Sequence, residues 1–245
     1  MPLISVIVPT FNAEKHIDKC LQSLESQSFR NFDVWLMDGG STDDTVALAR
    51  GYEGRIGAGV HVLSAKDEGV YDAMNKGISK SSGAWLYFIG ADDVLFDSKV
   101  FGDLENYFNG GSLDFVYGDV VKKTTGKRHA GPWALDKLLF QGNICHQSIF
   151  YRREVFERLG GYNLRYPIWA DWDMNIRCFK YPDLKSLWVD RVIAVFNDGM
   201  GLSRNGDPVF RKELPVMIKK DVERACSYRK KMGIIFKRAR ACLKR

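Results

Sequence analysis

Oxygen-rich side chains recur at four places in the first 93 residues, each time soon after a short apolar run. The four places are PTFN at 9–12, DGGSTDDT at 38–45, KDEG at 66–69 and GADD at 90–93. Carboxylates are the hard ligands that Mg²⁺ and Mn²⁺ prefer, so the adjacent Asp92 and Asp93 could hold such a cation. Any one of the four could instead be only a turn or a helix cap, as Asp92-Asp93 would be for a helix starting near Val94. Their recurrence favours a binding site.

The apolar pattern predicts the elements that carry these four clusters. Strands are expected over 3–9, 33–38, 59–64 and 84–90, and helices over 72–82 and 98–107. Between the first two strands Ile17, Leu21 and Leu24 recur at helical spacing, with Asn12 as the predicted cap of that helix. Strands that alternate with helices are typical of βαβ units around a mainly parallel sheet, whose ligands bind beyond the carboxyl ends of the strands. All four clusters are therefore expected at one edge of one sheet.

The pattern changes past residue 120 without a linker-like composition. We expect a hairpin or edge strand over 120–129, a strand over 146–151, a short helix over 153–161, a helix through 175–179 and a strand over 187–196. Residues 196–207 hold three glycines and no periodicity, which predicts a loop. The sequence thus predicts one α/β domain over 1–205, with halves at 1–120 and 121–205. A C-terminal basic helical tail over 206–245 is expected to follow it.

The composition is that of a packed soluble protein: 245 residues, of which 45% are hydrophobic, 13% aromatic and 27% charged. No apolar run approaches the roughly 20 residues needed to span a bilayer. The opening MPLISVIVP lacks a basic leader, so export is not expected. The five cysteines are odd in number and scattered, which argues against a disulfide framework or a zinc site and favours a reducing cytosol.

The net charge of +6 is a property of the C-terminal end. Residues 204–245 hold 14 basic and 4 acidic residues, whereas the first 203 hold 22 basic and 26 acidic, a net of −4. A nucleic-acid binder would spread basic residues along a groove, so no nucleic-acid partner is expected. Residues 229–245 carry eight basic and no acidic residues, with apolar residues at spacings of three and four. This pattern is typical of a helix lying on an anionic membrane surface, although a helix packed on the domain would show the same stripe.

Six sequence blocks, taken in order, carry a resemblance to a known family. They are SVIVPTFN, DGGSTDDT, DEGVYDAMNKGI, GADD, HQSIFYRREVFERLGGYN and ADWDMNIR. Together they closely resemble the bacterial family 2 inverting glycosyltransferases over residues 3 to about 200. The resemblance implies a single glycosyltransferase A-type domain, a nucleotide-sugar donor with UDP as the expected nucleotide, and Mg²⁺ or Mn²⁺ as cofactor. The implied reaction is inverting transfer of the sugar to a lipid-linked surface-polysaccharide acceptor, by a cytoplasmic enzyme at the inner face of the cell membrane.

The resemblance also implies roles for residues at the strand ends. The expected donor-binding residues are Pro9, Thr10, Asn12, Asp38, Asp67 and Asp92, and the expected metal ligand is Asp93. Within this set Asp92 would face the ribose of the nucleotide, and Asp38 would accept a hydrogen bond from the base. The tetrapeptide at 41–44 is assigned mainly to capping the helix that follows.

An acceptor hydroxyl must lose its proton as it attacks the anomeric carbon, and a carboxylate opposite the leaving group is the usual base. The block WADWD implies that Asp171 is this catalytic base. Ala170 stands where many members of the family have Glu, so Asp173 is the fallback assignment. Both carboxylates could instead only cap the helix that follows.

Four further residues are candidates for the acceptor side or for a closing loop: His146, Trp169, Trp172 and Arg204. Aromatic faces stack on sugar rings, but tryptophans near a helix start are more often packing residues. His146 would lie near the active centre or be a hydrogen-bonded core residue. Arg204 would approach the diphosphate when the loop at 198–206 closes.

Two other functions fit part of the sequence. A sugar nucleotidyltransferase shares the sheet and the acidic metal site, but it would present a glycine-rich, basic loop where this chain has PTFNAEKH. A noncatalytic, membrane-associated nucleotide-sugar-binding module would not need Asp38, Asp93 and Asp171 together. A metal-dependent inverting glycosyltransferase is therefore the favoured interpretation.

Overall fold

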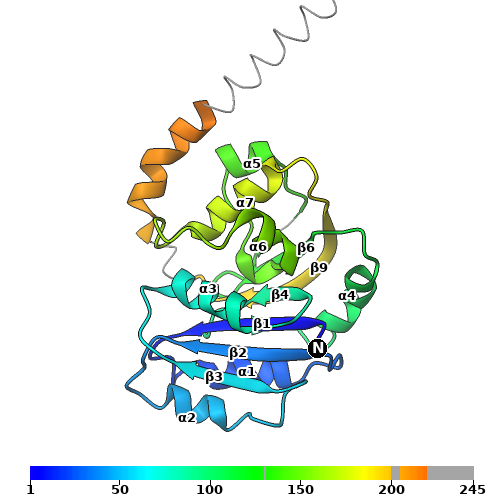
Figure 1. The fold of residues 1–245 in the computed structure, drawn as a ribbon, viewed down its shortest axis with the longest axis vertical. Coiled ribbons are helices and arrows are strands. Elements are labelled where there is room, and N and C mark those ends of the chain that lie inside the picture. Colours follow the sequence, from blue (N-terminus) through cyan, green and yellow to red (C-terminus); the bar gives the residue numbers. More distant parts are fainter. Residues whose placement is uncertain (130, 200–204, 220–245) are drawn as a thin grey trace, which may run out of the picture.

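The computed structural model describes residues 1–129, 131–199 and 205–219 of the chain (Figure 1). In this part of the chain nine strands form one sheet, in the order β3-β2-β1-β4-β8-β6-β9-β5, with β7 paired to β6. The strands are β1 (Ile4–Thr10), β2 (Phe32–Asp38), β3 (Val60–Ser64), β4 (Trp85–Phe88), β5 (Val94–Leu95), β6 (Phe115–Lys122), β7 (Arg128–His129), β8 (Ile149–Arg152) and β9 (Ser186–Phe196). The helices are α1 (Ile17–Glu25), α2 (Thr45–Arg50), α3 (Val70–Lys80), α4 (Val100–Asn109), α5 (Leu135–Phe140), α6 (Arg153–Leu159), α7 (Ala170–Lys180) and the 3₁₀ helix η1 (His146–Ser148).

The first half of the chain builds the parallel part of the sheet, as the sequence predicts. β1 pairs in parallel with β2 and β4, and β2 pairs in parallel with β3. The register places Thr10 opposite Asp38 and Asp38 opposite Ser64, so these three strands end level with one another. The loops that carry the oxygen-rich clusters therefore leave the sheet at one edge.

Apolar residues cover both faces of the sheet and form two core clusters. Ile4, Val6 and Val8 of β1 belong to the cluster that includes α1 and α4, whereas Ile7 belongs to the cluster that includes α3. This alternation follows from the two-residue repeat of a strand. The second cluster continues through α5, α6 and α7, so these three helices cover the same face of the sheet as α3 (Figure 1).

The second half adds a mixed extension to the sheet, and two of its predicted boundaries were wrong. β8 runs antiparallel to β4 and β6, β9 runs parallel to β6, and β5 runs antiparallel to β9. β6 already starts at Phe115, ahead of the predicted hairpin at 120–129, because its first residues pair with both β8 and β9. The predicted strand at 146–151 starts only at Ile149. The N–H of Ser148 donates to the carbonyl of Cys145 (2.9 Å) and thereby closes the turn η1.

Asn12 does not cap α1, contrary to the sequence-based expectation. Its φ is +47°, its N–H donates to Oγ of Ser41 (2.7 Å), and its Oδ1 accepts the N–H of Thr42 (3.0 Å). α1 begins at Ile17, and the preceding His16 makes no side-chain cap hydrogen bond. Asn12 instead ties the end of β1 to the turn that follows β2.

Residues 208–219 form a helix that packs on the second half of the domain. The carboxylate of Asp207 accepts the N–H of Phe210 (3.0 Å), which caps this helix. The Phe210 ring is fully buried against Trp169 and Trp172. This helix therefore supports residues that the sequence assigns to the site.

The predicted division into a domain at 1–205 and a tail at 206–245 stays a prediction. Arg204 and the basic segment 229–245 lie outside the described residues. Within the described ranges, no helix is both long enough and apolar enough to cross a bilayer.

Candidate active site

A cleft of about 680 Å³ opens where the strand ends of the first half face the start of α7. Ten of the residues predicted for the site line this cleft: Pro9, Thr10, Asn12, Asp67, Asp92, Asp93, His146, Trp169, Asp171 and Trp172. We call the lining from 9–13, 67–74 and 90–93 the strand wall, and the lining from 143–147 and 168–172 the helix wall. The structure thus brings together side chains that lie far apart in the sequence.

The two adjacent carboxylates end the strand wall. Asp93 is only 2% exposed, and its two oxygens accept hydrogen bonds from Nε2 of Gln147 (2.7 Å) and the N–H of Asn197 (2.7 Å). Nδ2 of Asn197 also donates to Asp92 (3.0 Å). Burial first, and the like charge of Asp92 second, raise the pKa of Asp93 to about 6. A Cβ at Gly90 would lie 2.8 Å from Oδ2 of Asp93, so a glycine is needed for this close approach.

The chemistry of this carboxylate pair fits a divalent cation. Two carboxylates held side by side repel each other, and a cation between them would relieve that repulsion. Among the described residues, no group of three or more His, Cys, Asp or Glu side chains could hold a metal ion. Mg²⁺ is commonly bound by one or two carboxylates together with substrate phosphates, and the Asp92-Asp93 pair matches that arrangement.

Asp38 lies outside the cleft lining and organises the turn after β2. Its carboxylate is 2% exposed and accepts the N–H groups of Gly40 (3.1 Å) and Ser41 (3.0 Å) and the hydroxyl of Ser64 (2.6 Å). The Ser41 hydroxyl also donates to it. The predicted contact of Asp38 with the nucleobase stays a prediction.

Thr10 and Phe11 of the strand wall also line the cleft. Oγ1 of Thr10 is buried and has no hydrogen-bond partner among the described residues. Phe11, which the sequence analysis did not assign to the site, is 63% exposed and lines the same wall. A hydroxyl free to bond and an open aromatic face are what a bound heteroaromatic ring needs.

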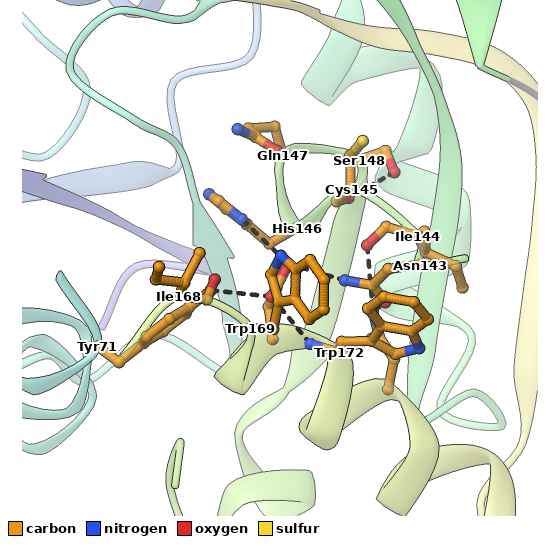
Figure 2. A network of polar contacts seen from close by, with 12 residues as sticks. Tyr71, Asn143, Ile144, Cys145, His146, Gln147, Ser148, Ile168, Trp169 and Trp172 are labelled. Carbon is orange, nitrogen blue, oxygen red and sulfur yellow. Dashed lines mark hydrogen bonds and ion pairs between the residues drawn. The ribbon is translucent and has the colours of Figure 1, made fainter. Parts of the chain in front are cut away.

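Asp171 lies in the first turn of α7 and is held by three donors. Its Oδ1 accepts the hydroxyl of Tyr71 (2.8 Å) and the N–H of Trp172 (2.9 Å), and its Oδ2 accepts Nδ2 of Asn143 (2.9 Å). Figure 2 shows Tyr71 of the strand wall on the left and Asn143 of the helix wall on the right. Neither residue is predicted as part of the site from the sequence, although Tyr71 belongs to the block DEGVYDAMNKGI.

Asp173, the fallback for the base, is placed differently. It does not line the cleft, and its carboxylate accepts a hydrogen bond from Nε of Arg177 (2.8 Å) within α7. Burial raises its pKa above the ordinary range. The geometry therefore favours Asp171, which faces the cleft, over Asp173, which pairs with a cation of its own helix.

The two tryptophans both pack in the domain and line the cleft. Nε1 of Trp172 donates to the carbonyl of Leu138 (2.7 Å), and the rings of Trp169 and Trp172 lie 5.2 Å apart. The guanidinium of Arg211 lies 5.0 Å from the centre of the Trp169 ring. The structure thus shows that both rings pack in the domain, and the predicted contact of either ring with the acceptor stays a prediction.

His146 sits between the two acidic groups of the cleft. Its Nδ1 lies 3.6 Å from Oδ2 of Asp171, and the side chain is 17% exposed. Its Nε2 is buried without a hydrogen-bond partner in the described part of the chain. The next residue, Gln147, binds Asp93, so the turn η1 links the helix wall to the strand wall.

Comparison with known proteins assigns this fold and cleft to a family. Residues 5–160 match the family model described as Glycosyl transferase family 2, so the chain belongs to that family. It is 42% identical over 217 residues to the "PGL/p-HBAD biosynthesis glycosyltransferase" of Mycobacterium tuberculosis and of Mycobacterium bovis, covering 88% of this chain and 85% of those proteins. The protein is therefore a glycosyltransferase.

Solved structures share the fold at lower sequence identity. Staphylococcus aureus TarS 1-349 superposes with a TM-score of 0.67 at 20% identity, covering 80% of this chain and 60% of that one. The mannosyltransferase PcManGT from Pyrobaculum calidifontis, solved with GDP-Man and Mn²⁺, has a TM-score of 0.63 at 19% identity, covering 84% and 58%. These likenesses confirm the predicted α/β glycosyltransferase A-type fold.

Proposed function

We propose that this glycosyltransferase moves a sugar from a UDP-sugar to a hydroxyl of a lipid-linked glycan acceptor, with inversion at the anomeric carbon. One observation carries the proposal. Asp93 and Asp171 come from opposite walls of the same cleft, and each is buried and hydrogen-bonded. That placement suits a leaving diphosphate on one side of a sugar and an attacking hydroxyl on the other.

The strand wall would bind the nucleotide diphosphate. Thr10 offers an unpartnered hydroxyl, Phe11 an open ring for stacking, and Asp92 a carboxylate for the ribose. Asp67 lies beside them, where its Oδ1 accepts the N–H of Gly69 (2.9 Å) at the start of α3. Solved neighbours titled as complexes with UDP or UDP-GlcNAc support UDP as the nucleotide.

Asp93 would be the protein's main ligand to Mg²⁺ or Mn²⁺. When bound, the cation stabilises the charge that grows on the diphosphate as the glycosidic bond breaks. Neighbours titled as complexes with Mn²⁺ support a divalent ion in this fold. Gln147 and Asn197 would keep the Asp93 carboxylate in place through their hydrogen bonds.

Asp171 would act as the general base. The acceptor hydroxyl passes its proton to this carboxylate while its oxygen forms the new bond to the anomeric carbon. The old bond breaks on the opposite side, and its electron pair leaves with the diphosphate. A single displacement of this kind inverts the anomeric configuration.

The helix wall would bind the acceptor against Trp169, Trp172 and His146. The relative named for PGL/p-HBAD biosynthesis supports a glycan or glycolipid product. We further propose that residues 229–245 hold the enzyme at the anionic inner face of the cell membrane and that Arg204 reaches the diphosphate. The eight basic residues of that segment support the first of these assignments.

The direct test is slow hydrolysis of a panel of UDP-, GDP- and TDP-sugars by the purified protein, with Mn²⁺ and then with a chelator. We expect the protein to hydrolyse one UDP-sugar. This hydrolysis should stop when chelator is added and should be absent in Asp93→Asn. Turnover that persists in chelator would contradict the metal role. Preference for another nucleotide would contradict the UDP assignment.

A further inference from the structure

The carboxylate of Asp171 is fixed by side chains from both halves of the chain. Tyr71 reaches it from α3, 100 residues away in the sequence, and Asn143 reaches it from the segment before η1. Tyr71 is only 5% exposed, and its single hydroxyl proton is shared between Asp171 and the carbonyl of Ile168, each 2.8 Å from the hydroxyl oxygen. The carboxylate therefore receives hydrogen bonds from both the strand wall, through Tyr71, and the helix wall, through Asn143.

The amide of Asn143 has one consistent orientation. Its Oδ1 accepts Nδ2 of Asn175 (2.7 Å), so its NH₂ group must face Asp171. Asn175 is fixed in turn, because its Oδ1 accepts the hydroxyl of Tyr151 (2.7 Å) and its Nδ2 also donates to the carbonyl of Ile144 (3.2 Å). Hydrogen bonds from Tyr151 of β8 through Asn175 of α7 thus fix the orientation of the Asn143 amide, with its NH₂ group toward Asp171.

We propose that Asn143 and Tyr71 are positioning residues for Asp171, which hold its carboxylate ionised and turned toward the acceptor. The proposal rests on the proposed function of Asp171 as the base. Hydrogen bonds donated to a carboxylate favour its charged form, and a base must be charged before it can take a proton. A carboxylate offers about four acceptor positions. Three donors bind here, two at Oδ1 and one at Oδ2. Oδ2 also lies 3.6 Å from Nδ1 of His146, and Asp171 lines the cleft.

Five titratable side chains surround this carboxylate in the described part of the chain: Tyr71 of α3, Cys145 and His146 at η1, Tyr151 of β8 and Tyr162 after α6. Burial, and then the charge of Asp171, raise the pKa of Tyr71 well above its usual value, so its hydroxyl remains a donor. The same two causes raise the pKa of Cys145 to about 12. His146 Nδ1 lies 3.6 Å from the same carboxylate, so the role of His146 has to be separated by experiment.

The test is the pH dependence of kcat/KM for sugar transfer by the full chain. Asn143→Asp places a second carboxylate against Asp171, and Tyr71→Phe removes one donor from it. We expect both to move the acid limb of the profile to higher pH, by about one unit for Asn143→Asp. We also expect both to lower kcat by about 10- to 100-fold with an unchanged donor KM. The same shift should persist when His146→Asn is added.

Tyr162→Phe is the matched control. Its ring lies 5.3 Å from that of Tyr71, and its buried hydroxyl has no hydrogen-bond partner among the described residues. It should leave the acid limb in place. An unmoved acid limb in folded Asn143→Asp and Tyr71→Phe would overturn the positioning role. If Asp171→Asn remains fully active, the proposed base is wrong; if it is inactive while Asn143→Asp keeps the wild-type profile, only the positioning role fails.

Discussion

The two walls of the cleft are built in different ways. The strand wall is placed by backbone pairing, since β1, β2 and β3 end level and their loops follow directly. The helix wall is placed by side chains, since Asp171 depends on Tyr71, Asn143 and the buried Asn175. A sheet edge thus defines where a nucleotide can lie, whereas the position of the base depends on a few amides and one hydroxyl.

The two central carboxylates also differ in their surroundings. Asp93 lies beside another carboxylate, and its pKa is raised to about 6 by burial and by that neighbour. Asp171 has no carboxylate beside it in sequence; it lies next to His146 and accepts three hydrogen bonds, whereas Asp93 accepts two. The first environment suits a group that meets a cation, and the second suits a base. Changes in each wall should therefore produce different defects.

The largest expected effect comes from Asp171→Asn in the helix wall. Loss of a general base lowers turnover by about 10²- to 10⁴-fold, and we expect about 10³-fold here. The measurement is incorporation of labelled sugar from the active donor into a lipid extract. Asp173→Asn is the control, because Asp173 pairs with Arg177 outside the cleft. Equal losses in both variants would contradict the assignment.

A large effect on stability is expected from Phe210→Ala. The ring is fully buried behind Trp169 and Trp172, and truncation of a buried Phe costs about 3 to 5 kcal/mol of unfolding free energy. Denaturant titration measures this loss. Val209→Ala, at a position 37% exposed on the same helix, should change stability by less than about 0.5 kcal/mol. If both substitutions lower the unfolding free energy by similar small amounts, the helix at 208–219 does not support Trp169 and Trp172.

A smaller effect is expected from pH on the metal-free protein. Asp93 has a folded pKa of about 6 against 3.8 for the free side chain, so it ionises more readily when unfolded. The fold should therefore lose stability as pH rises between these values, by about 3 kcal/mol. The readout is the difference between wild type and Asp93→Asn, unfolded in chelator at several pH values. If the unfolding free energies of wild type and Asp93→Asn change with pH in the same way, the folded protein does not raise the pKa of Asp93.

The smallest effect is expected from Phe11→Ala in the strand wall. Stacking of one base on an aromatic ring contributes about 1 to 3 kcal/mol, so UDP should bind roughly 10-fold more weakly. Because Phe11 is 63% exposed, folding stability should hardly change. Phe96→Ala, at a position 45% exposed that does not line the cleft, is the control for UDP titration. Unchanged affinity in Phe11→Ala would remove the ring from the nucleotide site.

The sequence predicted where the strands end far better than it predicted the contacts that hold Asp171. Continuous apolar runs define buried parallel strands, and acidic residues at their ends are expected to meet. The hydrogen bonds that hold Asp171 could not be predicted in this way. Their residues, Tyr71, Asn143 and Asn175, are common residue types that come together only through tertiary packing. The misplaced cap at Asn12 has the same cause, since its partners Ser41 and Thr42 belong to a distant turn.

The most direct test of the account is titration of UDP with Mn²⁺ into wild type, Asp93→Asn and Asp171→Asn by calorimetry. The two carboxylates lie on opposite walls, so we predict that Asp93→Asn weakens UDP binding by about 10-fold or more. Asp171→Asn should bind UDP within about twofold of wild type. Equal weakening by both substitutions, or full binding by Asp93→Asn, would contradict the division of the cleft into a nucleotide wall and a base wall.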